Sequence, residues 1–394
     1  MVITNSFTYI AFLMFIAGGL LFLEKKTKWK VFNVVPPLVW IYVLNMVFCT
    51  MGLYSSDACS AAYGSLKNNI LYAMIFVMLL RCDFRKLGKL GPRMIAIFMG
   101  CAFTLAIGFI VCYPLFMGVL GGGEKTWAAT AALYASWVGG SANMAAMQDA
   151  LPVDAGAYSC ALALDTVCYS LWIALLLAVR YANKWNNSVK ANTTGLDAIA
   201  EAANAEVAKD KKHATASDWI FLIGLSLMVS AVFQWLGASA NEGLKAIGLG
   251  MFDKGTCVTV FITIFGLICA MTPLGKLPAV EDLSSVYLYA VVSLLASTAS
   301  VTDLLTAPMW VVYGIAILVI HVVLMYILCK VFHWDLCMCS TASVACIGGS
   351  ASAPIIATAY DPSFAGIGVL MGVLGAAIGN FCGLGMGAIL HLFV

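Results

Sequence analysis

The chain has 394 residues, of which 62% are hydrophobic and only 10% are charged, and its mean hydropathy is +0.97. A chain this apolar cannot stay soluble as a globule, so the composition predicts an integral membrane protein within a lipid bilayer. The 21 basic and 19 acidic residues nearly cancel and give no bias toward nucleic acid, so no nucleic-acid partner is expected.

Apolar runs along the chain mark the helices that we expect to span the membrane, because about 20 apolar residues cross a bilayer. Residues 3–23 are long enough to span and show no signal-peptide cleavage pattern, so we expect them to be retained. The expected spans are 3–23, 32–54, 68–80, 92–119, 126–150, 155–180, 218–237, 256–274, 284–302, 307–331, 335–358 and 363–393.

The basic loops 24–30 and 81–93 predict the cytoplasmic side, which puts the N-terminus outside. The polar segment 181–217 also carries basic residues, and it reaches the cytoplasm only if 126–150 enters and leaves on the same side. We favour such a hairpin over a straight crossing, because it satisfies the charge rule. Within the linker, 196–212 has the composition of a surface helix or a mobile segment.

Two glycine-rich motifs repeat at matching places in the two halves of the chain. "GGSAN" at 139–143 and "GGSAS" at 348–352 both interrupt an apolar segment. "LYA" also occurs twice, at 71–73 and at 288–290. We therefore expect two homologous repeats, 1–180 and 218–394, joined by the linker 181–217. An odd number of crossings in each half would make these repeats inverted, as in many secondary transporters.

Each motif offers the chemistry of a transport site. A broken helix presents free backbone N–H groups and a positive helix end to an anion, and carbonyl oxygens to a hard cation such as sodium. The alternative is that the small residues only let helices pack closely. A single motif would fit both interpretations equally well, whereas two motifs at matched positions favour the transport site. The candidate substrate-binding residues are Gly139, Gly140, Ser141, Asn143, Gln148, Gly348, Gly349, Ser350, Ser352 and Asn380.

Asp165 is the best candidate for a coupling-ion ligand or proton carrier, because it lies in the middle of the 155–180 span. A carboxylate at that depth is costly and usually faces an ion pathway, although a structural aspartate bonded to neighbouring backbone is the alternative. The hydroxyl-rich run 297–303 would complete an ion site or merely cap its own helix. Its candidate ligands are Ser297, Thr298, Ser300 and Thr302.

Several other functions lack their motifs. The chain has no HExxH zinc motif, GxSxG elbow or P-loop, so we expect neither an enzyme nor a built-in ATPase. A channel explains the two matched breaks less well than alternating access does. The 14 cysteines have no metal-ligand or disulfide spacing, which predicts buried thiols and no metal or cofactor beyond sodium. His321, alone on an apolar helix, is taken as a packing residue.

The two GGSA motifs, "ANMAAMQDAL" at 142–151, Asp165 and "GVLMGVLGAAIGN" at 368–380 resemble the YjcL-like membrane protein family, domain of unknown function 819. More distantly the chain is similar to sodium:glutamate and citrate symporters and to the folds of bile-acid symporters and cation:proton antiporters. The resemblance implies inverted repeats, a dimerising scaffold domain, and a core domain that slides as an elevator, with core elements at about 92–180 and 307–394. It lends no substrate, because Ser141 and Ser350 follow the paired glycines here, where those symporters have other residues.

We thus predict an all-α polytopic membrane protein with two inverted repeats and two broken helices or hairpins. The predicted function is symport of a small polar or anionic metabolite, such as an amino acid, a carboxylate or a short peptide, coupled to sodium or protons. The alternative is a sodium/proton antiporter that uses Asp165 and carries no organic substrate. A homodimer in a bacterial inner membrane is the expected setting.

Overall fold

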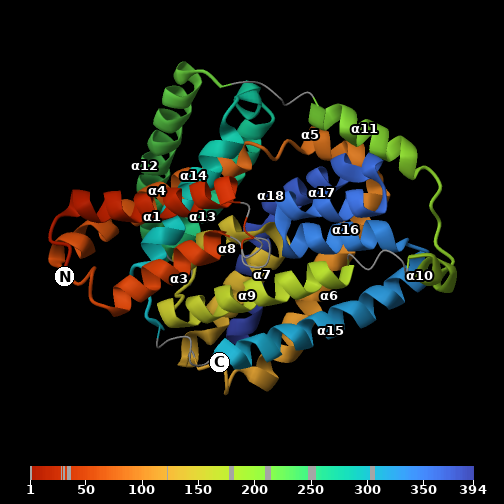
Figure 1. The fold of residues 1–394 in the computed structure, drawn as a ribbon, viewed down its shortest axis with the longest axis horizontal. Helices are drawn as coiled ribbons and strands as arrows, with labels where there is room; N and C mark the ends of the chain where they lie inside the picture. Colours follow the sequence, from red (N-terminus) through yellow and green to blue (C-terminus); the bar gives the residue numbers. More distant parts are fainter. Residues whose placement is uncertain are drawn as a thin grey trace.

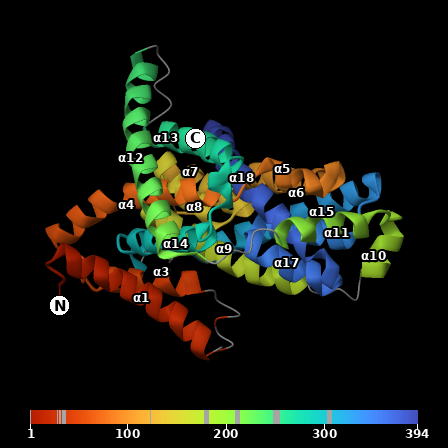
Figure 2. The same ribbon diagram turned by 90° about the horizontal axis from the view of Figure 1, so that it is seen from above.

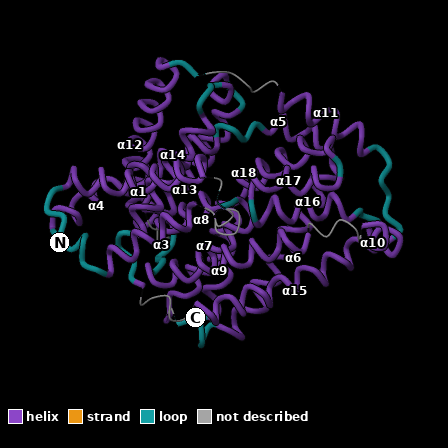
Figure 3. The backbone as a smooth tube through the Cα atoms, viewed as in Figure 1, coloured by secondary structure: helices purple, strands orange, loops and turns teal. Residues whose placement is uncertain are grey.

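A computed structural model shows a helical protein and describes residues 2–27, 29, 32, 37–121, 123–176, 182–208, 214–246, 254–301 and 307–394. No strand occurs among these residues, and short turns join most of the helices (Figure 3). In the first half the helices are α1 (Ser6–Thr27), α3 (Pro37–Thr50), α4 (Asp57–Leu79), α5 (Phe84–Leu87), α6 (Gly91–Phe116), α7 (Thr126–Gly139), α8 (Ser141–Ala150) and α9 (Ala155–Leu176). The linker carries α10 (Ala182–Val189) and α11 (Leu196–Ala208). In the second half they are α12 (Ala216–Ala246), α13 (Lys254–Ala270), α14 (Val280–Ala296), α15 (Ala307–Phe332), α16 (Leu336–Ile347), α17 (Gly349–Tyr360) and α18 (Ala365–Leu390).

Six helical stretches within the described residues are long and apolar enough to cross a membrane. Their outer faces carry large bare apolar side chains, including Phe7 at 79%, Leu115 at 74% and Ile220 at 74% exposure. In water such faces would favour aggregation, but against lipid tails they carry no penalty. The chain is therefore an integral multi-pass membrane protein. The six stretches are Ser6–Thr27, Phe84–Phe116, Ala155–Leu176, Ala216–Lys245, Ala307–Phe332 and Ala365–Phe393.

The helices gather into two groups. In Figure 1, α1, α3, α4, α12, α13 and α14 lie on the left, and α6, α15, α16 and α17 lie on the right. Helices α7, α8 and α18 lie between them in the centre. Seen from above, α1 and α12 extend away from the rest at one end of the molecule (Figure 2).

Residues 126–150, which contain the first glycine motif, form two helices, α7 and α8, that fold back on each other. A Cβ placed on Gly383 of α18 would lie 2.6 Å from the Cβ of Ala135 in α7 and 2.8 Å from the sulfur of Met147 in α8. One face of α18 thus touches both arms at the same level. At 1.5 Å per residue, the arms of 14 and 10 residues are only about 21 and 15 Å long, too short to cross alone. Residues 126–150 therefore form the predicted hairpin and not one continuous helix.

The second break has the same form. The hydroxyls of Ser340 in α16 and Tyr360 in α17 lie 3.3 Å apart, although 20 residues separate them in the chain. The predicted single span 335–358 is therefore also a hairpin, with arms of 12 residues each. Asp335 starts α16 by accepting a hydrogen bond from the Met338 backbone N–H at 2.9 Å.

Several predicted boundaries also change. The span expected at 68–80 is the end of a longer helix, α4, which Ser56 caps. In the linker, the predicted surface helix is α11, whose Asn204 side chain accepts a bond from the Gly366 N–H at 2.8 Å and donates one to the Ser363 carbonyl at 2.6 Å. These bonds fix α11 against the start of α18, so it is part of the packed fold.

Candidate functional site

The first hairpin turns at Gly140, whose φ of +95° and ψ of 174° are open only to glycine at little cost. The Gly140 N–H donates to the Ser136 carbonyl at 2.7 Å and closes α7. The Gly140 carbonyl accepts from the Asn143 N–H at 3.0 Å and opens α8. The reversal therefore needs one residue, and that residue is the second glycine of the motif.

The second hairpin turns in the same way at Gly349, with a φ of +70°. The N–H of Gly348 donates to the Val344 carbonyl at 2.7 Å and closes α16. A Cβ on Gly348 would lie 2.5 Å from the ring of Tyr169, so this glycine also permits a close approach. Ser350 follows within α17, and its side chain lies outside the described residues.

The two tips meet across the molecule. A Cβ on Gly349 would lie 3.8 Å from the Cα of Gly140. Both tips line one cavity of about 290 Å³, which we call the inner cavity. Its residues from the hairpins are Gly139, Gly140, Ser141, Ala142, Gly348 and Gly349, and its other residues are Met78, Arg81, Cys82, Glu281, Ser284, Ser285, Leu288, Tyr289, Val373 and Ala376.

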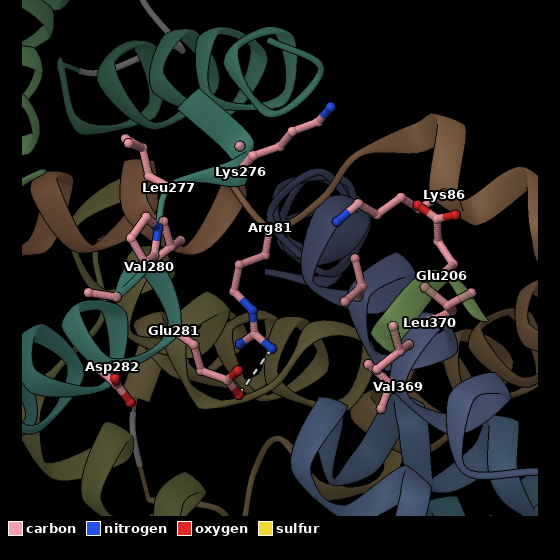
Figure 4. Close-up of a pocket in the computed structure, with 15 residues that line it drawn as sticks. Arg81, Lys86, Glu206, Lys276, Leu277, Val280, Glu281, Asp282, Val369 and Leu370 are labelled. Atoms are coloured by element: carbon pink, nitrogen blue, oxygen red, sulfur yellow. Dashed lines mark ion pairs between the residues drawn. The ribbon is translucent and has the colours of Figure 1, made fainter. Parts of the chain in front are cut away.

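The electrostatics of the inner cavity favour an anion. Helices α8 and α17 both begin at it, so the positive ends of two helix dipoles face one space. Arg81 also lines it and pairs with Glu281 at 3.1 Å. These two residues and Val373 also line a second cavity of about 350 Å³, the outer cavity (Figure 4). The Arg81–Glu281 pair thus lies where the two cavities meet.

Two candidate residues lie behind the first tip and do not line the inner cavity. The Asn143 Nδ2 group donates to Asn380 Oδ1 at 2.9 Å and to the Ala376 carbonyl at 3.2 Å. Asn380 in turn donates to the Thr263 hydroxyl of α13 at 3.0 Å. Both amides are buried, and Asn143 Oδ1 has no hydrogen-bond partner among the described residues. They fix the tip to α18 and α13, so direct contact with substrate in the inner cavity, as expected from the sequence, is not seen.

The remaining candidates of the hairpins are also outside the inner cavity. Ser352 is bonded to the hydroxyl of Tyr169 at 2.5 Å, which joins α17 to α9. Gln148 lies on the second arm of the first hairpin, and its buried Oε1 has no hydrogen-bond partner in the described part of the chain. Neither side chain lines the space between the tips.

Asp165 lies one helical turn behind the first tip. Its carboxylate accepts from the Ser136 hydroxyl at 3.0 Å and from the Trp137 indole N–H at 2.8 Å. Both donors are neutral, so no basic side chain among the described residues compensates an ionised Asp165. The carboxylate therefore holds the last turn of α7, from which the tip continues.

The hydroxyl run after α14 is not gathered around Asp165. Ser297 is bonded to Tyr9 of α1 at 2.5 Å, and Thr298 to the backbone of its own helix at 2.9 Å. Ser300 lies 3.4 Å from Thr50 of α3, and Thr302 is outside the described residues. Tyr289 is the last residue of α14 that lines the inner cavity, so the run, which begins at Ser297, starts about 12 Å farther along the helix. Thr298 thus fits the alternative interpretation, in which the hydroxyls of the run cap their own helix.

Charged residues around the site were not among those that the sequence motifs predicted. Arg81 was considered only as part of the basic loop 81–93, and Glu281 was not singled out, although the two lie just after one LYA segment and just before the other. A second missed pair is Lys67 with Asp149, at 3.0 Å and with 14% of each side chain exposed. Asp149 ends the first hairpin and Lys67 lies on α4, so this pair joins the hairpin to the left-hand group.

Two acidic side chains outside the spanning helices have pKa values that neighbouring groups lower. Partial burial acts to raise the pKa of Asp83, but hydrogen bonds and the charge of Arg85 outweigh it and lower that pKa. The Ser363 hydroxyl and N–H lower the pKa of Asp361 in the same way.

His321 is buried on α15, and its two ring nitrogens lie 2.8 Å from the hydroxyls of Thr104 and Ser343. These contacts support its interpretation as a packing residue. Within the described residues, no three His, Cys, Asp or Glu side chains form a group that could hold a metal ion.

The fold and the site define a helical, multi-pass membrane protein in which two glycine-tipped hairpins, one from each half, meet at a cavity that also contains the Arg81–Glu281 ion pair. The chain belongs to the family described as "Protein of unknown function (DUF819)", whose pattern matches residues 11–393. This membership confirms the family resemblance seen in the sequence. No curated protein and no solved structure matches the chain.

Proposed function

We propose that the protein is a secondary active transporter that moves a small polar or anionic metabolite together with sodium or a proton. The observation that carries the proposal is the meeting of two hairpin tips at one cavity, with Gly349 against Gly140. Irregular backbone at membrane depth is tolerated where it lines a wet cavity, and broken elements from two halves build the substrate site in many transporters. The cavity of about 290 Å³ suits a small molecule.

The pairing of helices supports inverted repeats. The two helices that carry LYA, α4 and α14, run antiparallel. Arg81, just after the end of α4, pairs with Glu281 at the start of α14. Cys59, near the start of α4, shares a hydrophobic cluster with Leu294, near the end of α14. The helices after them, α6 and α15, also run antiparallel. Trp310, near the start of α15, donates to the Leu120 carbonyl, just past the end of α6, at 2.8 Å. Equivalent helices of opposite direction are what an inverted repeat predicts.

The position of the inner cavity supports an elevator mechanism. One wall is made of the two hairpins and α18, and the opposite wall is made of α4 and α14. In this proposal the hairpins, α6, α9, α15 and α18 are the moving core, and the left-hand group of Figure 1 is the scaffold through which a homodimer forms. Sliding of the core past α4 and α14 would expose the substrate to alternate sides of the membrane, here assigned as a bacterial inner membrane.

Asp165 is the proposed coupling residue, because its charge lies behind the tip and the described residues give it no basic partner. A proton on its carboxylate, or a sodium ion beside it together with carbonyl oxygens, would neutralise that charge. A core with an uncompensated buried charge is costly to move through the membrane, so the ion would have to be bound before movement. No catalytic residue and no cofactor beyond sodium enter this mechanism. The competing function is sodium/proton exchange at Asp165 without an organic substrate.

The test is the thermal midpoint of the detergent-purified protein with amino acids, carboxylates and short peptides, each in sodium and in choline at two pH values. A compound that binds the native state must raise the midpoint by mass action. Symport predicts a compound whose shift needs sodium or low pH in the wild type and loses that dependence in Asp165→Asn. A shift by sodium alone, to which no compound adds, favours the antiporter. No shift by any ion or compound refutes both.

A further inference from the structure

We propose that Arg81 is the residue that recognises a negatively charged group of the substrate, and that Glu281 occupies Arg81 until the substrate displaces it. The inference rests on the proposed transport function and deepens it: it names the substrate as an anion and assigns its recognition to one exchange of partners. It comes from the position of the pair between the inner and outer cavities, which the sequence motifs do not indicate.

Arg81 is the only basic side chain of the described residues that lines the inner cavity, and Glu281 is the only acidic one. The rest of the polar lining consists of hydroxyls, from Ser141, Ser284, Ser285 and Tyr289, and of the two hairpin tips. With Glu281 bound to Arg81, the pair is neutral. No other acidic side chain of the described residues lines the cavity to neutralise the positive helix ends at the tips. An anionic substrate group would face two helix ends and one guanidinium.

The two partners differ in exposure, which decides which one moves. Only 25% of the Arg81 side chain is exposed, whereas 71% of the Glu281 side chain is. Arg81 directly follows α4 and lines the inner cavity with the hairpin tips, while Glu281 is at the first turn of α14 and can rotate into water. Because exposed ion pairs are weak, a substrate carboxylate or phosphate that also meets the helix ends can replace Glu281. Figure 4 shows Arg81 extending into the outer cavity, with Glu281 beside its guanidinium.

The outer cavity has further basic side chains, Lys86 and Lys276, alongside the acids Glu206, Glu281 and Asp282. Asp282 lines the outer cavity and not the inner one, and it follows Glu281 directly in α14. It is therefore the matched control for Glu281: same helix turn, same charge, no contact with Arg81 among the ion pairs of the described residues. Lys86 serves in the same way as the control for Arg81.

The exchange predicts opposite effects of the two partners on binding. In Glu281→Gln the internal competitor is gone, so the affinity for an anion rises by up to about fivefold, the occupancy ratio expected for an exposed pair. In Arg81→Gln anion binding is lost. Asp282→Asn and Lys86→Gln change it by less than about twofold. The probes are L-glutamate, L-aspartate, succinate, citrate and inorganic phosphate, with L-glutamine and succinamide as neutral counterparts, measured through the thermal midpoint of the full chain.

A second measurement needs no substrate. A cysteine placed at Ser285, in the inner cavity, is labelled with an anionic or a cationic methanethiosulfonate, and the two rates are compared by mass spectrometry. The ratio of anionic to cationic labelling should rise about two- to fivefold in Glu281→Gln and fall by a similar factor in Arg81→Gln. Equal ratios in all three backgrounds overturn the proposal, as does anion binding that survives Arg81→Gln unchanged.

The outcomes separate this inference from the proposed function. If a neutral or cationic compound shows ion-dependent binding that Arg81→Gln leaves intact, the transporter stands and the assignment of Arg81 falls. If no compound of any charge binds and the labelling ratios still respond as expected, the anion-selective cavity stands and the proposed symport falls.

Discussion

Replacing Asp165 with asparagine should remove a charge from the core of the protein while leaving its structure in place. Asparagine keeps one acceptor oxygen, which can take the Trp137 N–H that now lies 2.8 Å from Asp165. Its amide N–H can donate to the Ser136 oxygen, which now lies 3.0 Å from the carboxylate, because a hydroxyl can accept as well as donate. Both contacts survive with the roles of one of them reversed.

The expected size of the change follows from those two bonds. A hydrogen bond to a charged group contributes about 1 kcal/mol more than a neutral one, so the two together lose about 2 kcal/mol. Burial of an uncompensated carboxylate costs several kcal/mol, and the neutral amide avoids that cost. We therefore expect Asp165→Asn to be at least as stable as the wild type, or to lose no more than about 2 kcal/mol. Asp165→Leu, which leaves the indole N–H without an acceptor, should be about 2–3 kcal/mol less stable than Asp165→Asn.

The assay is the thermal midpoint of wild type, Asp165→Asn, Asp165→Leu and Ser136→Ala in the same detergent. Ser136→Ala is the control, because it removes one donor and keeps the charge. The order expected is wild type and Asp165→Asn together, with Asp165→Leu well below. If Asp165→Asn and Asp165→Leu fall equally far, the carboxylate is needed for folding itself, and the reasoning that assigns its charge to ion coupling is refuted.

Three further changes test other parts of the structure. Gly140→Ala should cost about 1–3 kcal/mol by backbone strain alone, since its Cβ would meet no atom within 4 Å, whereas Gly64→Ala in a regular helix turn should be neutral or stabilising; equal midpoints would contradict the left-handed turn. Lys67→Met should cost about 1–3 kcal/mol, because Asp149 then keeps only its bond from the Tyr72 hydroxyl, and Lys67→Met with Asp149→Asn should recover part of the loss; additive losses in a double-mutant cycle would show that the pair is not coupled. Asp83, whose pKa is lowered in the folded chain, should stabilise the wild type over Asp83→Asn above about pH 4; the advantage should begin to shrink below its ordinary pKa of 3.8 and be lost as the pH falls through the lowered pKa of the folded chain, and a difference that is as large at pH 3 as at pH 6 would contradict this.

The hairpins could be predicted because their cause is local. Gly140 and Gly349 adopt left-handed backbone, and a pair of glycines within an apolar segment is typical of a helix that breaks there. The positive-inside rule then favoured a hairpin over a crossing, since basic residues on both sides of 126–150 had to share the cytoplasm. Asp165 was also visible, because a carboxylate deep within a span is rare.

The partners of these residues could not be predicted, because they depend on how distant helices pack. That the tips meet, through Gly140 and Gly349, is what two matched breaks in inverted repeats predict, but the side chains that surround the tips come from other helices. Asn143 was assigned to substrate because it belongs to a motif, but its side chain is bonded to Asn380 and the Ala376 carbonyl of α18. Arg81 and Glu281 belong to helix ends, where charge is common, so only the fold shows that they meet beside the tips.

The contacts of the first hairpin indicate where sliding must begin if the transport proposal holds. Its tip is bound to α18 through Asn143 and Asn380, two amides that are buried away from solvent. Its far end is bound to α4 through Lys67 and Asp149, a pair that is still 14% exposed on each side. Opening the amide contact would leave polar groups buried without partners, whereas the charged pair can take up water as it separates. The hairpin should therefore move with α18 and away from α4 and α13, so the Lys67–Asp149 pair and the bond from Asn380 to Thr263 of α13 both have to break.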